Sequence, residues 1–139
     1  MYLVRLIYAS QISPEFKAED IENILEVAQR DNKKRFITGM LCFNRKYFLQ
    51  CLEGSRAVVN ETYQLICRDK RHQNVVILDY CQIDRREFAD WSMGYVPTSR
   101  MKEQLILTYS PKNEFLPFEL SGEGAHGMML ALRNQVEKS

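Results

Sequence analysis

Three neutral polar side chains fall where the sequence pattern predicts an apolar core. The clearest is Gln50, inside the apolar run 47–52. On a strand, alternate side chains point to one face, so Gln50 shares a face with Phe48 and Leu52. An amide has two N–H donors and an acceptor oxygen, and burying it unpaired costs roughly 1–3 kcal/mol. We therefore expect Gln50 to have a bonding partner.

Tyr8 and Asn32 are predicted to face the same compartment. Tyr8 shares its strand face with Val4 and Leu6, and Asn32 follows Ile21 by close to three helical turns. Each alone has a structural explanation: a tyrosine at a core rim, a helix C-cap, a glutamine bonded to backbone. Together the three indicate a bound polar, planar ligand. A flavin, with carbonyl and N–H groups along its ring edge, fits this chemistry, and so does another heterocycle.

The usual motifs of nucleotide-binding sites and enzymes are missing. Without G-x-G-x-x-G or a P-loop, a Rossmann site is excluded. Positive charge is offered instead by runs 69–72 and 33–35, although such runs are commonly solvated. His72 and His126 are the only histidines, and no Ser-His-Asp or Cys-His arrangement is found. Run 9–12 lacks the arginine of an acylphosphatase loop, and nothing suggests a nicotinamide site, so an enzyme is not expected.

Composition predicts an ordinary globular domain. The chain has 139 residues, 45% hydrophobic and 27% charged, with a net charge of +1. This balance gives no support for direct nucleic-acid binding. The N-terminus does not resemble a signal peptide, and no apolar run approaches the roughly 20 residues that span a bilayer. We therefore expect a cytoplasmic protein without a membrane partner.

The four cysteines, Cys42, Cys51, Cys67 and Cys81, include no C-x-x-C pair, and no histidine stands at zinc-ligand spacing. Without an export signal a disulfide framework is not expected. They are therefore interpreted as buried, reduced thiols.

Apolar periodicity predicts the elements that must position these side chains. Strands are expected at 2–9, 36–43, 47–53, 75–83 and 93–96, and helices at 18–31 and 55–69. The order β-α-β-β-α-β-β indicates a ferredoxin-like α+β sandwich, with both helices on one face of a mixed sheet. Gly39, inside the second strand, predicts a bulge or the close approach of another group.

Residues 98–139 are expected to form a C-terminal helical extension to a domain of residues 1–97. Helices are predicted at 100–107 and 125–137, separated by Ser110-Pro111, Pro117 and the glycine-rich stretch 122–124. The extension is expected to pack on the open sheet face or to mediate contacts. It is too short for a cyclase or phosphodiesterase domain, so output is expected through a partner or through self-association.

Several motifs, in order, resemble those of BLUF domains, which are blue-light sensors that use a flavin. The resemblance covers residues 2–97, and the tail resembles that of short, single-domain members. The matching positions are Tyr8 in Arg-Leu-Ile-Tyr, Asn32, Ile-Thr-Gly-Met-Leu at 37–41, Gln50 in Phe-Leu-Gln, Leu-Glu-Gly at 52–54, Asp69, Arg71-His72 and Trp91-Ser92-Met93.

The resemblance implies FAD, with FMN as the alternative, bound noncovalently between the two helices. Asn32 is implied at the carbonyl and N3 edge of the ring. Gln50 is implied between Tyr8 and the N5/C4=O edge, and Ile66 against the ring.

The resemblance also implies a polar end of the site. Asp69, Arg71 and His72 are implied near the polar edge of the flavin or its ribityl-phosphate tail. Asp31 stands where the family often has Asn or His, and it receives no role.

The function implied is a light-driven hydrogen-bond switch. An electron and a proton leave Tyr8, relayed by Gln50, and then return, leaving the amide rotated or tautomerised. Trp91 and Met93 compete for the place beside Gln50 on the last strand, which passes the signal to the C-terminal helices. A downstream regulatory protein and self-association are expected. The alternative is a light-independent module for flavin binding or protein interaction.

Overall fold

The computed structural model describes residues 2–138, so the expected domain ends at Met1 and Ser139 lie outside the described residues. The first part of the chain holds β1 (Leu3–Ile12), α1 (Asp20–Arg35), β2 (Thr38–Phe43), β3 (Tyr47–Ser55), α2 (Arg56–Arg68), β4 (His72–Gln82) and β5 (Gly94–Pro97). The tail holds α3 (Glu103–Tyr109), α4 (Gly122–Lys138) and two 3-10 turns, Thr98–Arg100 and Pro117–Glu119.

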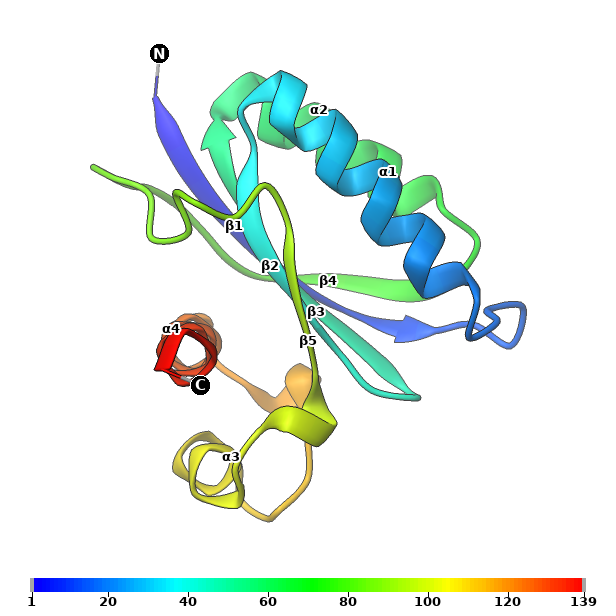
Figure 1. Ribbon diagram of the computed structural model, residues 1–139, viewed down its shortest axis with the longest axis vertical. Helices are drawn as coiled ribbons and strands as arrows, with labels where there is room; N and C mark the ends of the chain where they lie inside the picture. Colours follow the sequence, from blue (N-terminus) through cyan, green and yellow to red (C-terminus); the bar gives the residue numbers. More distant parts are fainter. Residues whose placement is uncertain (1, 139) are drawn as a thin grey trace.

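The strands form one mixed sheet in the order β4-β1-β3-β2-β5. All neighbouring pairs are antiparallel except β2 and β5, which run parallel. Helices α1 and α2 cover one face of the sheet, and α3 and α4 lie beyond the other face (Figure 1). The predicted ferredoxin-like α+β fold is confirmed, and the sheet separates a helix side from a tail side.

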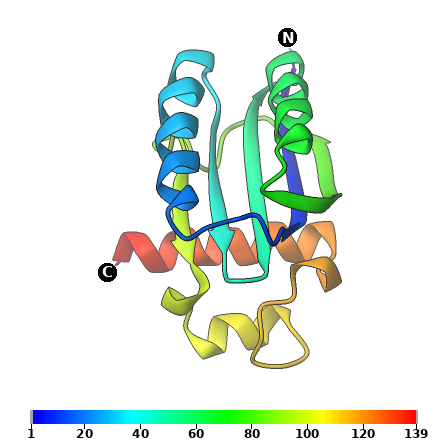
Figure 2. The ribbon, with the colours of Figure 1, turned by 90° about the vertical axis from the view of Figure 1, so that its right-hand side faces the viewer.

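Strand alternation gives each side its own core. The helix-side core includes Leu6, Tyr8, Leu41, Phe48, Leu52, Val59 and Met93. The tail-side core includes Ile7, Ala9, Leu49, Cys51, Phe88, Met128, Met129 and Leu132. Helix α4 crosses behind the strands in Figure 2 and supplies Met128 and Met129 to the tail-side core. Neighbouring residues of one strand therefore serve different cores.

The end of α1 differs from the prediction. The helix continues to Arg35, one turn beyond the expected end at Asp31, and Lys33, Lys34 and Arg35 form its last turn. Positive charge is favourable at this end of a helix dipole. Phe36 then adopts a left-handed conformation and is 77% exposed, so the next strand begins at Thr38 rather than at 36.

Strand boundaries also differ, and Met93, expected on the last strand at 93–96, lies just before β5. β1 extends to Ile12 and β4 begins at His72, because these two residues pair across the strands. His72, expected in a loop, therefore belongs to the sheet.

Gly39 marks a close approach, as its position inside a strand predicts. A Cβ atom there would lie 1.9 Å from the carbonyl oxygen of Cys51 on β3. Gly122 marks another, because its Cβ would lie 2.4 Å from the carbonyl oxygen of Leu78. The glycine-rich stretch 122–124 was therefore wrongly predicted as a separator: it forms the first turn of α4 against β4.

The cysteines are free, but they are not all buried. Cys42 and Cys51 are buried, whereas Cys81 is half-buried and Cys67 is exposed on α2. The prediction of four buried thiols is wrong for Cys67 because it faces away from the apolar stripe of its helix. Within residues 2–138, no helix has the length and apolar character required to cross a membrane.

Candidate functional site

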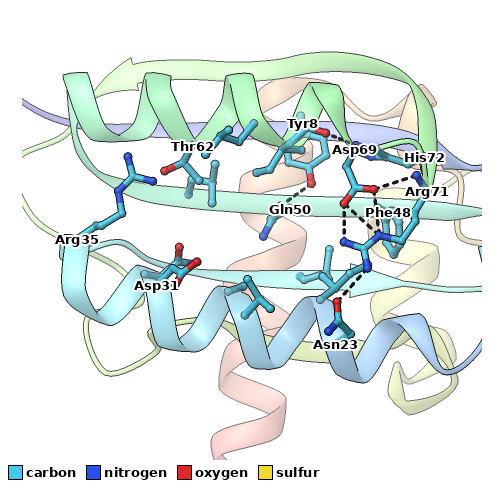
Figure 3. A pocket seen from close by; sticks show the side chains of 18 residues that line it. Tyr8, Asn23, Asp31, Arg35, Phe48, Gln50, Thr62, Asp69, Arg71 and His72 are labelled. Carbon is cyan, nitrogen blue, oxygen red and sulfur yellow. Dashed lines mark hydrogen bonds and ion pairs between the residues drawn. The ribbon is translucent and has the colours of Figure 1, made fainter.

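A cavity of about 300 Å³ lies between α1 and α2, with β3 and β1 at its floor (Figure 3). Its size is at the lower end of the range for small-molecule sites. The walls are largely apolar, and polar side chains lie at the floor and at both ends. The lining residues include Tyr8, Asn23, Ile24, Ala28, Asp31, Asn32, Arg35, Leu41, Phe48, Gln50, Leu52, Thr62, Ile66, Asp69, Arg71 and His72.

Tyr8 and Gln50 meet at the floor of the cavity. They are paired opposite each other on β1 and β3, and the Tyr8 hydroxyl donates to Gln50 Oε1 at 2.5 Å. Burial raises the pKa of Tyr8 well above its usual value, so the phenol keeps its proton. The amide oxygen of Gln50 faces Tyr8 in this arrangement, and the NH2 group points the other way.

Met93 lies on the other side of Gln50. Gln50 Nε2 donates to Met93 Sδ at 3.3 Å. Trp91 packs instead on the tail side, with its ring centroid 5.8 Å from that of Phe88. Of the two residues expected to compete for the place beside Gln50, the structure therefore has Met93 there.

Asn32 is buried and faces the cavity from α1, one turn before the helix ends. It is therefore not the C-cap of the helix. Its Nδ2 donates to the Ser92 carbonyl at 3.2 Å. Asn32 makes no other side-chain hydrogen bond to a residue that the structure describes, so its amide oxygen is available to a ligand.

Asp69 and Arg71 form an ion pair at one end of the cavity. The Asp69 carboxylate accepts from Arg71 Nε at 3.0 Å and from Arg71 Nη2 at 2.6 Å. The hydrogen bond from Arg71 holds the pKa of Asp69 below its usual value. Arg71 Nη1 also donates to Asn23 at 3.2 Å. The positive charge expected from run 69–72 is therefore largely compensated.

His72 is buried in the wall of the cavity rather than solvated. Its Nε2 lies 2.5 Å from the Ile66 carbonyl oxygen, and its Nδ1 lies 2.7 Å from Ser10 Oγ. A carbonyl oxygen only accepts, so Nε2 carries the hydrogen and Nδ1 is left to accept from Ser10. The ring contacts Tyr8 and Phe48 edge-on, which makes His72 a support for the floor.

At the other end of the cavity, the sequence offered the charged run 33–35 but no role for Asp31. Arg35 lines this end and pairs with the exposed Glu61 at 2.7 Å. Asp31 lies at the rim, about half exposed, and pairs with Arg30. The periodic spacing of Ile24, Ala28, Asp31 and Arg35 on α1 was available as a signal, but the expected helix end at Asp31 concealed it.

The arrangement fits a flavin ring. A planar heterocycle would have apolar walls from Ile24, Ala28 and Ile66, and amides along one edge. Asn32 offers an acceptor oxygen, and Gln50 offers N–H groups. None of the described residues form a cluster able to hold a metal ion. Fold and site thus define a ferredoxin-like domain with a buried site for a polar heterocycle.

Comparison with known proteins identifies the class. Residues 3–94 match the family model "BLUF: Sensors of blue-light using FAD". The chain belongs to the BLUF family, whose members bind flavin and sense blue light. This is a sensor family, and the enzymatic interpretation is not supported.

Solved structures agree in fold along nearly the whole chain. A structure described as the BlsA photo-activated state has a TM-score of 0.85 and 34% identity, covering 94% of each chain. The dark-state structure of BlrB, a BLUF protein, has a TM-score of 0.76 and 30% identity, covering 97% of this chain and 95% of that one.

The curated relatives are much longer proteins. The blue light- and temperature-regulated antirepressor BluF of Escherichia coli is 40% identical over 85 residues, which are 60% of this chain and 21% of the relative. The photoactivated adenylate cyclase subunit alpha of Euglena gracilis is 30% identical over 114 residues, 82% of this chain and 11% of the relative. The match thus spans 21% of the length of the first relative and 11% of the second.

Proposed function

We propose that this domain is a hydrogen-bond-switched light receptor with FAD, rather than FMN, bound noncovalently in the cavity between α1 and α2. Asn32 and Gln50 would hold the carbonyl and N–H edge of the ring, and Ile66 would pack against its face. Asn32 and Gln50 are buried, and both line one cavity together with the half-buried Ile66, which supports the assignment.

The polar end of the cavity would hold the rest of the cofactor. Asp69 and Arg71 would meet the polar edge of the ring or the phosphate-bearing tail, and His72 would support Tyr8 and Phe48 beneath it. The FAD assignment rests on the family description. Release of the cofactor by denaturation, followed by chromatography against FAD and FMN standards, tests it.

The bound flavin supplies absorption of blue light and an excited state that accepts an electron. Tyr8 would be the electron donor from this chain, and its proton would be relayed by Gln50 along the existing hydrogen bond as the electron leaves. When the electron returns, the proton would return to Tyr8, and Gln50 would be left rotated or tautomerised. An amide suits this role because exchanging its oxygen and nitrogen positions changes hydrogen bonds but not charge.

The short, buried Tyr8–Gln50 hydrogen bond is the observation that carries the mechanism. In an apolar site such a bond is stronger than in water, and the raised pKa of Tyr8 prevents loss of its proton in the dark. The phenol is therefore a donor until light removes an electron. The second bond of Gln50, to Met93 Sδ, is weak, so the bond to Tyr8 is the main hydrogen bond that holds the amide in place.

The output would pass through Met93. Rotation of Gln50 replaces the N–H group facing Met93 by an oxygen, which the sulfur cannot satisfy. β5 follows directly, and the tail, residues 98–139, would act as the output extension of a sensor domain of residues 1–97. A downstream regulatory protein, or a second copy of the chain, would read this change.

Substitution of either residue tests the mechanism. Tyr8→Phe and Gln50→Leu are expected to bind flavin but to lose the light-induced red shift of its absorption. Tyr95→Phe, at an exposed position on β5, is the control and should shift normally. A normal shift in Tyr8→Phe or Gln50→Leu would refute the mechanism.

The alternative is a light-independent flavin-binding or interaction module. Yellow protein without a reversible shift would favour the first, and colourless protein that takes up no FAD would favour the second. The Tyr8–Gln50 pair favours the receptor because a merely structural pair would not need to face a cavity.

A further inference from the structure

Glu53 is a fully buried carboxylate on the tail side of β3. It follows Gln50 by three residues and Cys51 by two, so it faces away from the cavity. A buried carboxylate is costly unless hydrogen bonds satisfy it. Glu53 Oε1 accepts from Thr38 Oγ1 at 2.8 Å, so one bond comes from the neighbouring strand β2.

The other bonds of this carboxylate come from the backbone of the β4–β5 loop, residues 83–93. Glu53 Oε2 accepts from the Glu87 N–H at 2.7 Å, and Oε1 accepts from the Phe88 N–H at 3.0 Å. Arg86 reinforces the contact by donating to Thr38 Oγ1 at 2.9 Å and to the Glu53 carbonyl at 3.1 Å. The Glu53 side chain therefore fixes two consecutive loop residues, and its backbone carbonyl holds Arg86 beside them.

The same loop leads to the switch residues. Four residues separate Phe88 from Met93, and within this span the Trp91 N–H donates to the Phe88 carbonyl at 2.9 Å. The Trp91 carbonyl in turn accepts from the Gly39 N–H at 3.0 Å. A loop held at Phe88 and at Trp91 leaves Met93 little freedom, so its sulfur stays beside Gln50.

The loop also contacts the tail through Arg133 of α4. Arg133 Nη1 donates to the Glu87 carbonyl and lies 3.6 Å from the Glu87 carboxylate. Its guanidinium carbon lies 5.8 Å from the centroid of the Phe88 ring, within the range of a cation–π contact. The two residues held by Glu53 are thus also the two that meet α4.

We propose that Glu53 is a positioning residue, which holds Glu87 and Phe88 against β3 and thereby sets both the place of Met93 beside Gln50 and the docking of Arg133 on the loop. Its role in the light response rests on the proposed function. The hydrogen bonds that Glu53 accepts from Glu87 and Phe88, which we call the clamp, exist in the dark and require no light. The two parts can therefore fail separately.

Glu53→Gln tests the clamp. Glutamine keeps the size of the side chain but replaces one acceptor oxygen by NH2, which cannot accept from a backbone N–H. Hydrogen exchange of flavin-loaded protein in the dark is expected to quicken at the Glu87 and Phe88 amides by roughly tenfold or more. The amide of Ile7, in β1, should change little. Glu114→Gln, which removes an exposed carboxylate paired with Lys112, is the control and should change neither.

The light response tests the coupling. Glu53→Gln is expected to change the size of the flavin spectral shift or its recovery in the dark several-fold, while the flavin stays bound. Arg133→Gln keeps the Glu53 bonds, so it should retain a normal spectral shift but lose any light-induced change in hydrogen exchange along α4. A wild-type protein without a light response would refute the proposed function. Hydrogen exchange in the dark would then still test whether Glu53 holds Glu87 and Phe88.

Two results would overturn the proposal. One is exchange at Glu87 and Phe88 that stays at the wild-type rate in Glu53→Gln, and the other is an equal increase at Ile7, which would mean general destabilisation. If Glu53→Gln does not fold, Thr38→Val replaces it, since it removes the hydroxyl that joins Glu53 to Arg86. Faster exchange confined to residues 86–88 is then expected, and unchanged or uniformly faster exchange would overturn the proposal.

Discussion

Met93 and Trp91 lie on opposite sides of the sheet, although a single residue separates them. Met93 Sδ accepts from Gln50 on the helix side, while the Trp91 ring packs with Phe88 on the tail side. Gly94 permits this arrangement, because a Cβ there would lie 2.1 Å from the Trp91 ring. A change at the cavity floor therefore has a short path through the sheet.

Replacement of Met93 should separate its packing from its hydrogen bond. Met93→Leu conserves volume, so the free energy of unfolding should fall by no more than about 1.5 kcal/mol. Because the sulfur acceptor is lost, the flavin dark-recovery rate should change several-fold. Denaturant titration and transient absorption measure the two effects. Met128→Leu, in the tail-side core, should leave recovery unchanged, and equal recovery in Met93→Leu and wild type would contradict a role for the sulfur.

Asn32 should contribute to flavin affinity. Asn32→Ala removes an amide with a free acceptor at the cavity wall, and a lost hydrogen bond of about 1–1.5 kcal/mol weakens binding roughly tenfold. Fluorescence titration of apoprotein with FAD measures the dissociation constant. Asn60→Ala, at an exposed position on α2, should bind as the wild type does, and equal affinities for all three proteins would argue against contact with Asn32.

Alkaline pH should destabilise the fold through Tyr8. Burial raises the pKa of Tyr8 in the native state, whereas an unfolded tyrosine ionises near pH 10. Above about pH 10 the native state therefore binds more protons than the unfolded state, and stability falls as pH rises. Below that pH the stabilisation is fully present.

Urea unfolding between pH 8 and 11 measures this contribution by comparing wild type with Tyr8→Phe. The free energies of unfolding should run parallel up to about pH 9.5 and then diverge, with the wild type falling more steeply by up to about 1.4 kcal/mol per pH unit. The buried thiols titrate in both proteins and cancel in the difference. Parallel curves throughout would mean that Tyr8 ionises in the native state.

Gly39→Ala should weaken the β2–β3 pair. The added methyl would lie 1.9 Å from the Cys51 carbonyl oxygen, so the strands must separate, and about 1–3 kcal/mol of stability should be lost. Gly124→Ala, in the first turn of α4, meets only Ser121 Oγ at 3.1 Å and should cost far less. Thermal unfolding of both variants checks this, and equal melting temperatures would contradict the close approach.

Much of the fold could be predicted because local patterns and tertiary packing agree. The two-residue period of β1 and β3 predicted that Tyr8 and Gln50 face one compartment, and the structure pairs them directly. Element ends were less predictable. The last turn of α1 is made of charged residues, 33–35, and a pattern of apolar residues cannot reveal a turn held by a helix dipole and a left-handed cap.

The residues at the floor of the site were predicted well, and those at its ends less well. Tyr8, Asn32 and Gln50 could be predicted because they are polar residues at positions where the apolar periodicity predicts burial. The state of Arg71 depends on Asp69 and Asn23, and the burial of His72 depends on Ser10 of another strand. The contacts of Arg71 with Asn23 and of His72 with Ser10 join elements far apart in the sequence, so the sequence alone could not reveal them. Glu53 received no role because two of its three partners are backbone N–H groups, which residue types do not reveal.

The two-sided use of the sheet has a consequence for protein engineering. Since the cavity and the tail-side core draw on alternate residues of β1 and β3, the tail could be exchanged for another helical module without altering any residue that lines the cavity. A transplanted module would need an apolar surface for Ile7, Leu49 and Cys51, together with a cation placed to meet Glu87. These requirements define the design rules for a chimaera that keeps the cavity and replaces the tail.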